Sequence, residues 1–308
     1  MKIKSLTTVV MAMVIGLAAA TAQAADKYLP FVLASNDAGT VADKLDATKK
    51  ALTDNGFQIA GEYTPYQGAH IIVVTNDELK KAASSHDRGG YVAAQRISLT
   101  EMGGKVQVSY TNPVYMSYAY RVNSKLPQTA SALKKALGFV QDFGPKESMD
   151  AEDLNEYHYT FGMEYFDEPL YLASKGSHDD MVAVIEKNLS SKRGGAAKVY
   201  KIDIPGTSQT LFGVSMKAPN EGKKYMDERF IMGEIDFKPL RSTAHLPYEI
   251  LVKGKEAEAL HARFRIAINF PDLAMMGDNS FMNIMPTPDA IRDLLTSVAG
   301  GTVEDDTF

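Results

Sequence analysis

The chain has no cysteine among its 308 residues. No disulfide can therefore cross-link the fold, and its stability has to come from buried apolar area, which a chain of this length can supply. The same absence excludes a cysteine nucleophile, cysteine-ligated zinc, iron–sulfur clusters and haem attached through C-x-x-C-H. It also excludes a lipid anchor on a cysteine at a cleavage site.

Long apolar runs are absent except near the N-terminus. There Lys2 and Lys4 precede an uncharged apolar run over residues 9–17, which is followed by the small residues of Ala22–Ala24. This order predicts a signal peptide over residues 1–24, because the run is too short for a stable membrane span. We expect a soluble, periplasmic or secreted protein that begins at Ala25 and has no membrane span after cleavage.

Clusters of basic residues are absent as well. The chain has 33 Lys and Arg against 38 Asp and Glu, and loss of the two lysines of the signal peptide takes the formal net charge from −5 to −7. Binding to phosphate backbones or anionic membranes needs clustered Lys and Arg. The sequence therefore argues against a nucleic acid or a membrane surface as partner.

Common enzyme motifs are missing too. The chain has no phosphate-binding P-loop, G-x-G-x-x-G, H-E-x-x-H or complete G-x-S-x-G, and no two histidines stand two or four residues apart. We therefore predict no cofactor and no histidine metal site. An enzyme stays open as an alternative, with His261 or His245 as base beside a carboxylate, because catalytic groups can come from distant positions.

The chain does contain one series of elements twice. Each copy opens with a strand, Phe31–Ser35 and Leu170–Ser174, followed by a capping pair and a helix with apolar residues at helical spacing. Two alternating or apolar strands, a short helix near Asp77–Ser85 or Glu221–Phe230, and a hairpin come next. We expect the second hairpin to join Tyr248–Val252 to Phe264–Ile268. A last helix is predicted at Pro127–Gly138 and at Pro288–Ala299.

This duplication predicts an α+β protein of two tandem two-layer α/β units, each with helices packed on one face of a mostly antiparallel sheet. The first repeat spans residues 25–140 and the second spans 157–308. Between them, residues 141–156 are acidic and contain Gly144 and Pro145, so we interpret this segment as a linker.

Several short motifs carry a resemblance to a known family. They are a helix ending in Gly56-Phe57, a strand opened by Leu246-Pro247, and a hairpin strand Val106–Tyr110 followed by Thr-Asn-Pro. In these motifs the chain resembles the bacterial domain-of-unknown-function family numbered 302, as two diverged copies. The resemblance implies helices on one face of a mostly antiparallel sheet, and it brings no catalytic residues.

A polar face is the first candidate binding site. If Phe264–Ile268 is a strand, then His261, Arg263, Arg265 and Asn269 share the face opposite the core and could hold an anion. A solvated face paired with nearby acids is the alternative. Tyr110 and Tyr118 are further candidates, because tyrosine combines an apolar ring with a polar tip, although a half-buried strand explains them equally well.

Methionines near the C-terminus are a second candidate. Met275 and Met276 are followed by Met282 and Met285. Thioethers bind Cu(I), so Met282 and Met285 are weak copper candidates. Flexible apolar side chains at a core edge or a partner surface are the alternative.

The leading hypothesis is a non-catalytic periplasmic binding or interaction protein. Two similar units would form a groove between them, and such grooves are common ligand sites. The partner would be a small molecule or an envelope protein. A histidine- and carboxylate-dependent enzyme acting on an exported substrate, and a structural subunit of an envelope complex, are the alternatives.

Overall fold

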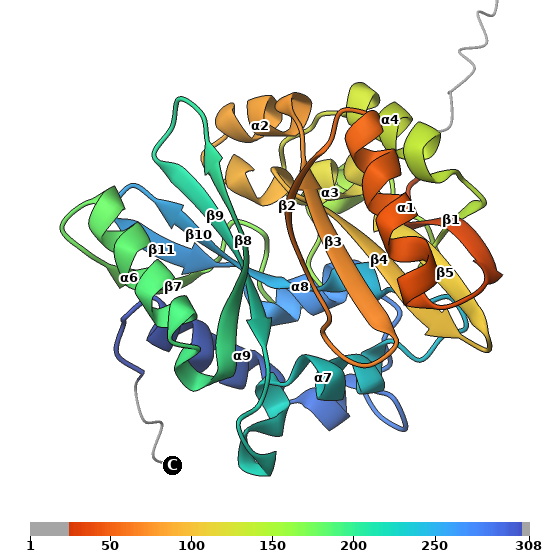
Figure 1. Cartoon of the computed structure of the whole chain (residues 1–308). Helices are drawn as coiled ribbons and strands as arrows, with labels where there is room; N and C mark the ends of the chain where they lie inside the picture. The colour runs from red at the N-terminus through yellow and green to blue at the C-terminus, as the bar shows by residue number, and fades with distance from the viewer. Residues whose placement is uncertain (1–24, 304–308) are drawn as a thin grey trace, which may run out of the picture.

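The computed structural model describes residues 25–303, so the predicted signal peptide lies outside the described residues. Two β-sheets lie next to each other in the molecule, and helices cover the outer side of each sheet (Figure 1). All strand pairs of both sheets are antiparallel. The predicted α+β class with two units is confirmed.

The first unit follows the predicted order of elements. They are β1 (Phe31–Ala38), α1 (Val41–Asp54), β2 (Gln58–Tyr63), β3 (Ala69–Thr75), α2 (Asp77–Ser84), the 3-10 turn η1 (Gly89–Val92), β4 (Gln95–Met102), β5 (Lys105–Thr111), α3 (Pro113–Ala119), α4 (Pro127–Leu137) and β6 (Gln141–Phe143). The short helix α5 (Ala151–Asn155) leads towards the second unit.

The second unit repeats this order. It contains β7 (Leu170–Ser174), α6 (His178–Ser190), the turn η2 (Arg193–Gly195), β8 (Ala196–Ile204), β9 (Gln209–Met216), η3 (Glu221–Met226), α7 (Glu228–Ile235), η4 (Thr243–His245), β10 (Tyr248–Lys253), β11 (Glu256–Ala259), α8 (Ala262–Asn269), η5 (Phe281–Ile284) and α9 (Thr287–Val298).

The strand order shows that the two units are built alike. It is β2-β3-β4-β5-β1 in the first sheet and β8-β9-β10-β11-β7 in the second. Both edge pairs also carry a bulge at the same place, beside Ala60 in β2 and beside Val199 in β8. The first sheet has one more strand, because β6 pairs with β1. Part of the segment interpreted as a linker is therefore a sheet strand.

The predicted second hairpin is wrong. β10 turns through Gly254 and Lys255 directly into β11, and Phe264–Ile268 lies inside α8. The sequence of β11, Glu-Ala-Glu-Ala, looks like a polar loop, because Glu and Ala are poor strand formers. In α8 seven of the eight residues are buried, so the helix has no polar stripe to reveal its period.

Local sequence explains where the two matching helices begin. Thr40 accepts a hydrogen bond from the amide of Asp43, whose carboxylate bonds back to the amide of Thr40, which forms a complete capping box for α1. Ser177 caps α6 by accepting a hydrogen bond from the amide of Asp180. These bonds satisfy amides that lack a partner within the helix.

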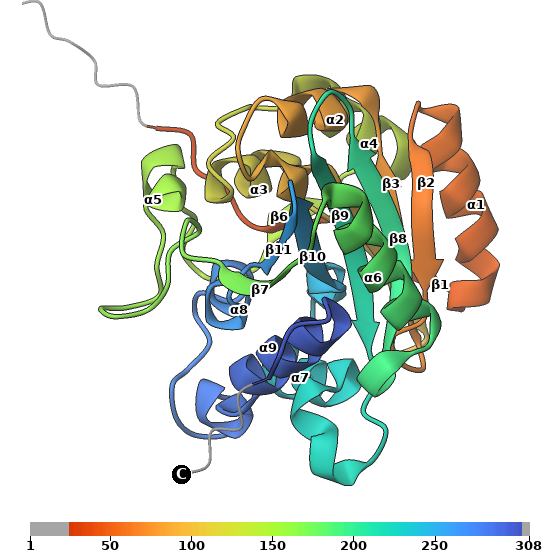
Figure 2. The same cartoon turned by 90° about the vertical axis from the view of Figure 1, so that its left-hand side faces the viewer.

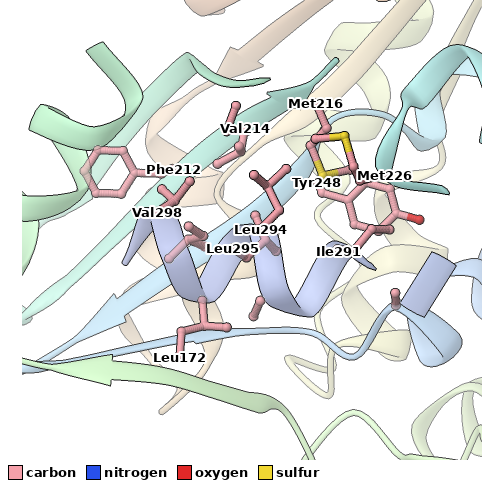
Figure 3. Packing of buried hydrophobic residues seen from close by; sticks show 14 of the residues in the cluster. Leu172, Phe212, Val214, Met216, Met226, Tyr248, Ile291, Leu294, Leu295 and Val298 are labelled. Carbon is pink, nitrogen blue, oxygen red and sulfur yellow. The ribbon is translucent and has the colours of Figure 1, made fainter. Parts of the chain in front are cut away.

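Each sheet packs its outer face on two helices. In the first unit α1 and α4 bring Leu52 and Leu133 onto Ile72, Val74 and their neighbours. In the second unit α6 and α9 cover the sheet. Figure 3 shows the side chains of α9 among those of the strands: Ile291, Leu294, Leu295 and Val298 lie near Leu172, Phe212, Val214, Met216 and Tyr248.

The inner faces of the two sheets share one core. Ile71 and Val73 of β3 belong to the same buried cluster as Ile202 of β8 and Leu251 of β10. Segments at the ends of the strands of each unit form hydrogen bonds to the other unit. The amide of Gly90 in η1 donates to Gln209 of β9 at 3.0 Å, and Thr100 of β4 donates to Thr243 of η4 at 2.9 Å. Neither unit therefore closes its core alone.

A glycine lets the two edge strands β2 and β8 approach each other. A Cβ atom built on Gly61 would lie 2.0 Å from the carbonyl oxygen of Val199. No side chain fits into that distance. The contact joins the two sheets at their bulges, so the bulges and Gly61 set the spacing between the units.

A second glycine gives a buried tyrosine its path. Tyr200 of β8, Gly213 of β9 and Glu249 of β10 stand in one row across the second sheet. The ring of Tyr200 crosses Gly213, and its hydroxyl donates to Glu249 at 2.6 Å. A Cβ atom on Gly213 would lie 2.0 Å from Cε1 of Tyr200.

We expect Gly213→Ala to lower the free energy of unfolding by about 1–3 kcal/mol, the usual cost of overpacking a core. Urea denaturation measures the loss. In a Tyr200→Ala background the ring that clashes with the new Cβ atom is gone. Gly213→Ala should therefore lower the free energy of unfolding by less in this background than in the parent. Equal costs in both backgrounds would contradict the proposed contact.

Candidate functional site

The structure separates the residues of the predicted polar face. His261 is the N-cap of α8, and its ring accepts from the amide of Arg263 at 3.3 Å. Arg265 and Asn269 follow four residues apart on a buried side of the helix, whereas Arg263 is half-exposed. The four residues therefore do not form one open face, because α8 is a helix and not a strand.

Both arginines of that face are already paired with carboxylates. Nε of Arg263 lies 3.0 and 3.1 Å from the two carboxylate oxygens of Glu164, and Nε2 of His261 lies 3.3 Å from one of them. Burial disfavours the charge of Glu164, but the bonds from Arg263 hold its pKa below the ordinary value. Burial lowers the pKa of His261. An anion would have to displace Glu164 to reach this arginine.

Arg265 belongs to a buried ion cluster between the units. Its Nη1 lies 3.0 Å from one carboxylate oxygen of Glu249, and Nη1 of Arg96 lies 3.1 Å from the other. All three side chains are about 1% exposed. Arg96 faces Val73 in the first sheet as Glu249 faces Gly213 in the second, so these two residues hold equivalent positions. The cluster fastens the units together and has no access for a ligand.

The two predicted tyrosines lie apart. Tyr110 of β5 is buried in the core under α1 and α4. Tyr118 of α3 lies at the edge of the shared inner core, where its ring is 5.5 Å from that of Tyr28. The alternating pattern of β5 places Tyr110 on the helix-covered face, which explains why it takes no part in a site near α8.

Three histidines of the described residues, His70, His245 and His261, each have different polar partners. His245 is fully buried, burial lowers its pKa well below the ordinary value, and its Nε2 lies 3.2 Å from the hydroxyl of Tyr248. The ring of His261 contacts Glu164 and Arg263. His70 contacts Thr64 at 3.0 Å, but its other nitrogen is 3.6 Å from Glu62. Across residues 25–303 no cluster of three or more His, Asp and Glu side chains could hold a metal.

A pocket at the junction of the units is the best candidate site. Its volume is about 230 Å³, at the small end of ligand pockets. We call it the junction pocket. It is lined by Phe143 and Gly144 after β6, by Ile235, Asp236, Lys238, Pro239, Leu240 and Ser242 after α7, and by Asn269, Phe270 and Asp272 at the end of α8.

The polar side of the junction pocket contains a free acceptor. Asn269 is 1% exposed, its Nδ2 donates to the carbonyl of Arg265 at 2.9 Å, and its Oδ1 has no hydrogen-bond partner. Buried polar atoms are rarely left without a partner, since that costs about 1–3 kcal/mol. A bound molecule with an N–H or O–H group would satisfy this oxygen.

Asp236 is the buried acid of the junction pocket. Burial raises its pKa to about 6, although the amide of Ser242 donates to the carboxylate at 2.8 Å and Arg241 lies nearby. A carboxylate that titrates near neutral pH is the kind of group that binding sites contain. The charge it carries above pH 6 is favourable for a ligand with a cationic or donor group.

The rim of the junction pocket joins the segment after β6 to the second unit. Nζ of Lys238 donates to both carboxylate oxygens of Asp272 at 2.7 and 2.8 Å and to the carbonyl of Gly144 at 3.1 Å. On the apolar side, the rings of Phe143 and Phe270 lie 5.6 and 6.5 Å from the ring of Phe31. The pocket thus combines aromatic walls with a few polar groups, as ligand sites do.

A neighbouring apolar pocket is too small to be a site. It lies between Tyr159, Met163, Phe270 and Phe281, with Arg263 at one side, and its volume of about 20 Å³ has room for a single water molecule.

Sequence reasoning found Asn269 but missed the rest of the junction pocket. Asp236 and Lys238 stand in an ordinary mixed stretch after α7, and Phe143 falls in the segment that the sequence predicts to be a linker. No periodicity connects these three segments, so only the packing of the units brings them together.

The comparisons add no relative. No protein-family model, no curated protein and no solved structure matches this chain. The resemblance to the family numbered 302 therefore stays a prediction. None of the helices in residues 25–303 combines the length and the apolar character that a membrane crossing requires.

Proposed function

We propose that this chain is an exported, non-catalytic binding protein whose ligand occupies the junction pocket. The observation that carries the proposal is the buried side chain of Asn269, a lining residue of the pocket whose Oδ1 has no hydrogen-bond partner. A site that leaves an acceptor unpaired selects a ligand with a donor, because a ligand without one leaves the acceptor unpaired.

The chemistry of the walls narrows the ligand. Asp236 and Asn269 offer acceptors, whereas Phe143, Leu240 and Phe270 offer apolar surface. Lys238, the cation of the pocket, is already bound by Asp272. The best fit is a compact amine or amide with a short apolar part.

Ligand-observed NMR and thermal denaturation test this function. The probes are butylamine and propionamide, and the control compound is methyl acetate, which is of similar size and has no N–H or O–H group. We expect the amine and the amide to show saturation transfer and to raise the melting temperature more than methyl acetate does. The absence of binding by both nitrogen probes would contradict the proposed ligand class.

The residue test uses Asn269→Leu, for which we expect at least a tenfold weaker affinity, about the 1.4 kcal/mol of one hydrogen bond. Asn188→Leu is the matched control. Asn188 is also a buried asparagine whose Nδ2 donates to a carbonyl, that of Val298 at 2.9 Å, but it lies in α6 away from the pocket. Asp236→Asn offers a second test that preserves the side-chain shape. Unchanged affinity in both pocket variants would refute the site.

The two alternatives, an enzyme and a structural subunit of an envelope complex, have less support than the binding function. An enzyme would need a histidine, an acid and a nucleophile in one cleft. A structural subunit would need a large exposed apolar patch. Both stay hypotheses beside the proposed binding function.

A further inference from the structure

The chain between α8 and α9 carries a group of exposed methionines. Met275, Met276, Met282 and Met285 are 40%, 74%, 49% and 57% exposed. Every other methionine in residues 25–303 is buried or half-buried. In Figure 2 this segment, in blue, runs along the outer side of the molecule below α8. Among the described residues, exposed methionine is thus confined to one loop, which we call the methionine loop (residues 274–285).

Backbone hydrogen bonds bring three of these methionines together. The amide of Met282 donates to the carbonyl of Met275 at 3.1 Å, and the amide of Met285 donates to the carbonyl of Met282 at 3.4 Å. Met282 also lies in η5 three residues before Met285, and side chains three residues apart in a 3-10 turn lie over one another. Met276 follows Met275 directly and makes no such pair.

The ligand chemistry of this loop is soft. It contains no histidine and no cysteine, and its oxygen-bearing side chains are those of Asp278, Asn279, Ser280 and Asn283. Thioether sulfur selects Cu(I), whereas Cu(II) and Zn(II) prefer imidazole and other nitrogen or oxygen ligands. Methionine has a long, unbranched side chain, so three sulfurs on residues whose backbones are hydrogen-bonded to one another can turn towards one ion.

We propose that Met275, Met282 and Met285 form a binding site for Cu(I). The site is separate from the junction pocket, and it does not depend on the proposed ligand of that pocket. A docking surface for an apolar protein segment is the other use that such a loop could have. A docking surface would depend on Met276 as much as on the other three methionines, whereas the proposed Cu(I) site does not depend on Met276.

The test is an anaerobic competition titration of the purified protein with Cu(I) and the chelator bicinchoninate. We expect one Cu(I) per chain. Leucine at position 275, 282 or 285 should weaken Cu(I) binding about tenfold or more. Loss of a group that only supports a metal ligand already has an effect of this size. The triple variant should lose binding. Leucine keeps the apolar character and similar size, so the fold is preserved.

Met276→Leu and Met149→Leu are the controls. The first removes the most exposed methionine of the same loop, and the second removes a half-buried methionine elsewhere. Both should bind Cu(I) as the parent does. In proteins labelled with 13C-methyl methionine, Ag(I) should shift the methyl signals of the three proposed ligands. Failure to compete for Cu(I), or equal losses in the Met276→Leu variant, would overturn the proposal.

Discussion

Replacing Glu249 by glutamine is expected to lower the free energy of unfolding by about 3–5 kcal/mol, the usual loss when one partner of a buried ion pair is removed. The carboxylate lies between two buried guanidinium groups, those of Arg96 and Arg265. Glutamine keeps the shape and can still accept from Tyr200, so the substitution removes mainly the charge. Two cations then stay in the shared core without a counter-ion. Urea denaturation measures the loss.

Glu186→Gln is the matched control. Glu186 also lies between two cations, Lys198 at 3.2 Å and Lys201 at 3.7 Å, but at the surface. Water screens such a pair, so we expect a loss below about 1 kcal/mol. If Glu249→Gln lowers the free energy of unfolding as little as Glu186→Gln does, the buried cluster contributes no electrostatic stability.

A triple variant separates charge from packing. Arg96→Met, Glu249→Leu and Arg265→Met together remove every charge of this cluster, and apolar replacement of a whole buried ion cluster is often neutral or stabilising. We expect this variant to be more stable than Glu249→Gln alone. The opposite order would mean that the hydrogen bonds of the arginines to the carbonyls of Ala244 and His245 dominate.

The fold was largely predictable because its signals are local. The side chains of Thr40 and Ser177 cap their helices by bonding to amides three residues further on. Apolar strands such as β3 can be predicted from their composition. The prediction failed at β11 and α8, where local preference and final structure disagree. Pairing with β10 forces Glu256–Ala259 into a strand, and burial on nearly all sides hides the period of α8.

The candidate site was not predictable to the same degree. Asn269 was singled out for a wrong reason, as part of a strand face. Asp236 gave no signal, because its burial follows from the packing of the segment after α7 and not from its neighbours in the sequence. The sequence predicts a groove between the two units. In the described residues the inner faces form a packed core where they meet. The junction pocket and a larger pocket between Pro65–Gln67 and the segment of η3 and α7 lie beside this core.

Asp236 is expected to make the stability of the protein fall as the pH rises from about 4 to 6. Burial raises its pKa from the ordinary value of 3.8 to about 6 in the folded protein. Between these two values the folded state binds a proton that the unfolded state has lost, so unfolding becomes easier as the pH increases. The full effect is about 3 kcal/mol, since one pKa unit corresponds to about 1.36 kcal/mol.

The measurement is the difference in unfolding free energy between Asp236→Asn and the parent at several pH values. Asparagine cannot titrate. The unfolding free energy of the variant relative to that of the parent should therefore rise by about 2 kcal/mol from pH 4.5 to pH 7. Taking this difference removes the contributions of other buried acids such as Glu228, whose pKa burial also raises well above the ordinary value. Asp46→Asn is the surface control, because that carboxylate is 96% exposed.

The same titration links stability to the proposed ligand. A bound ammonium group favours the charged form of Asp236, so it should bind more tightly above pH 6 than below pH 5 and should offset the loss of stability. Butylamine would then protect the parent most at pH 7 and have little effect on Asp236→Asn. If its protection is equal at both pH values, the acid takes no part in binding, whereas the pH dependence of stability without ligand would stand unaffected.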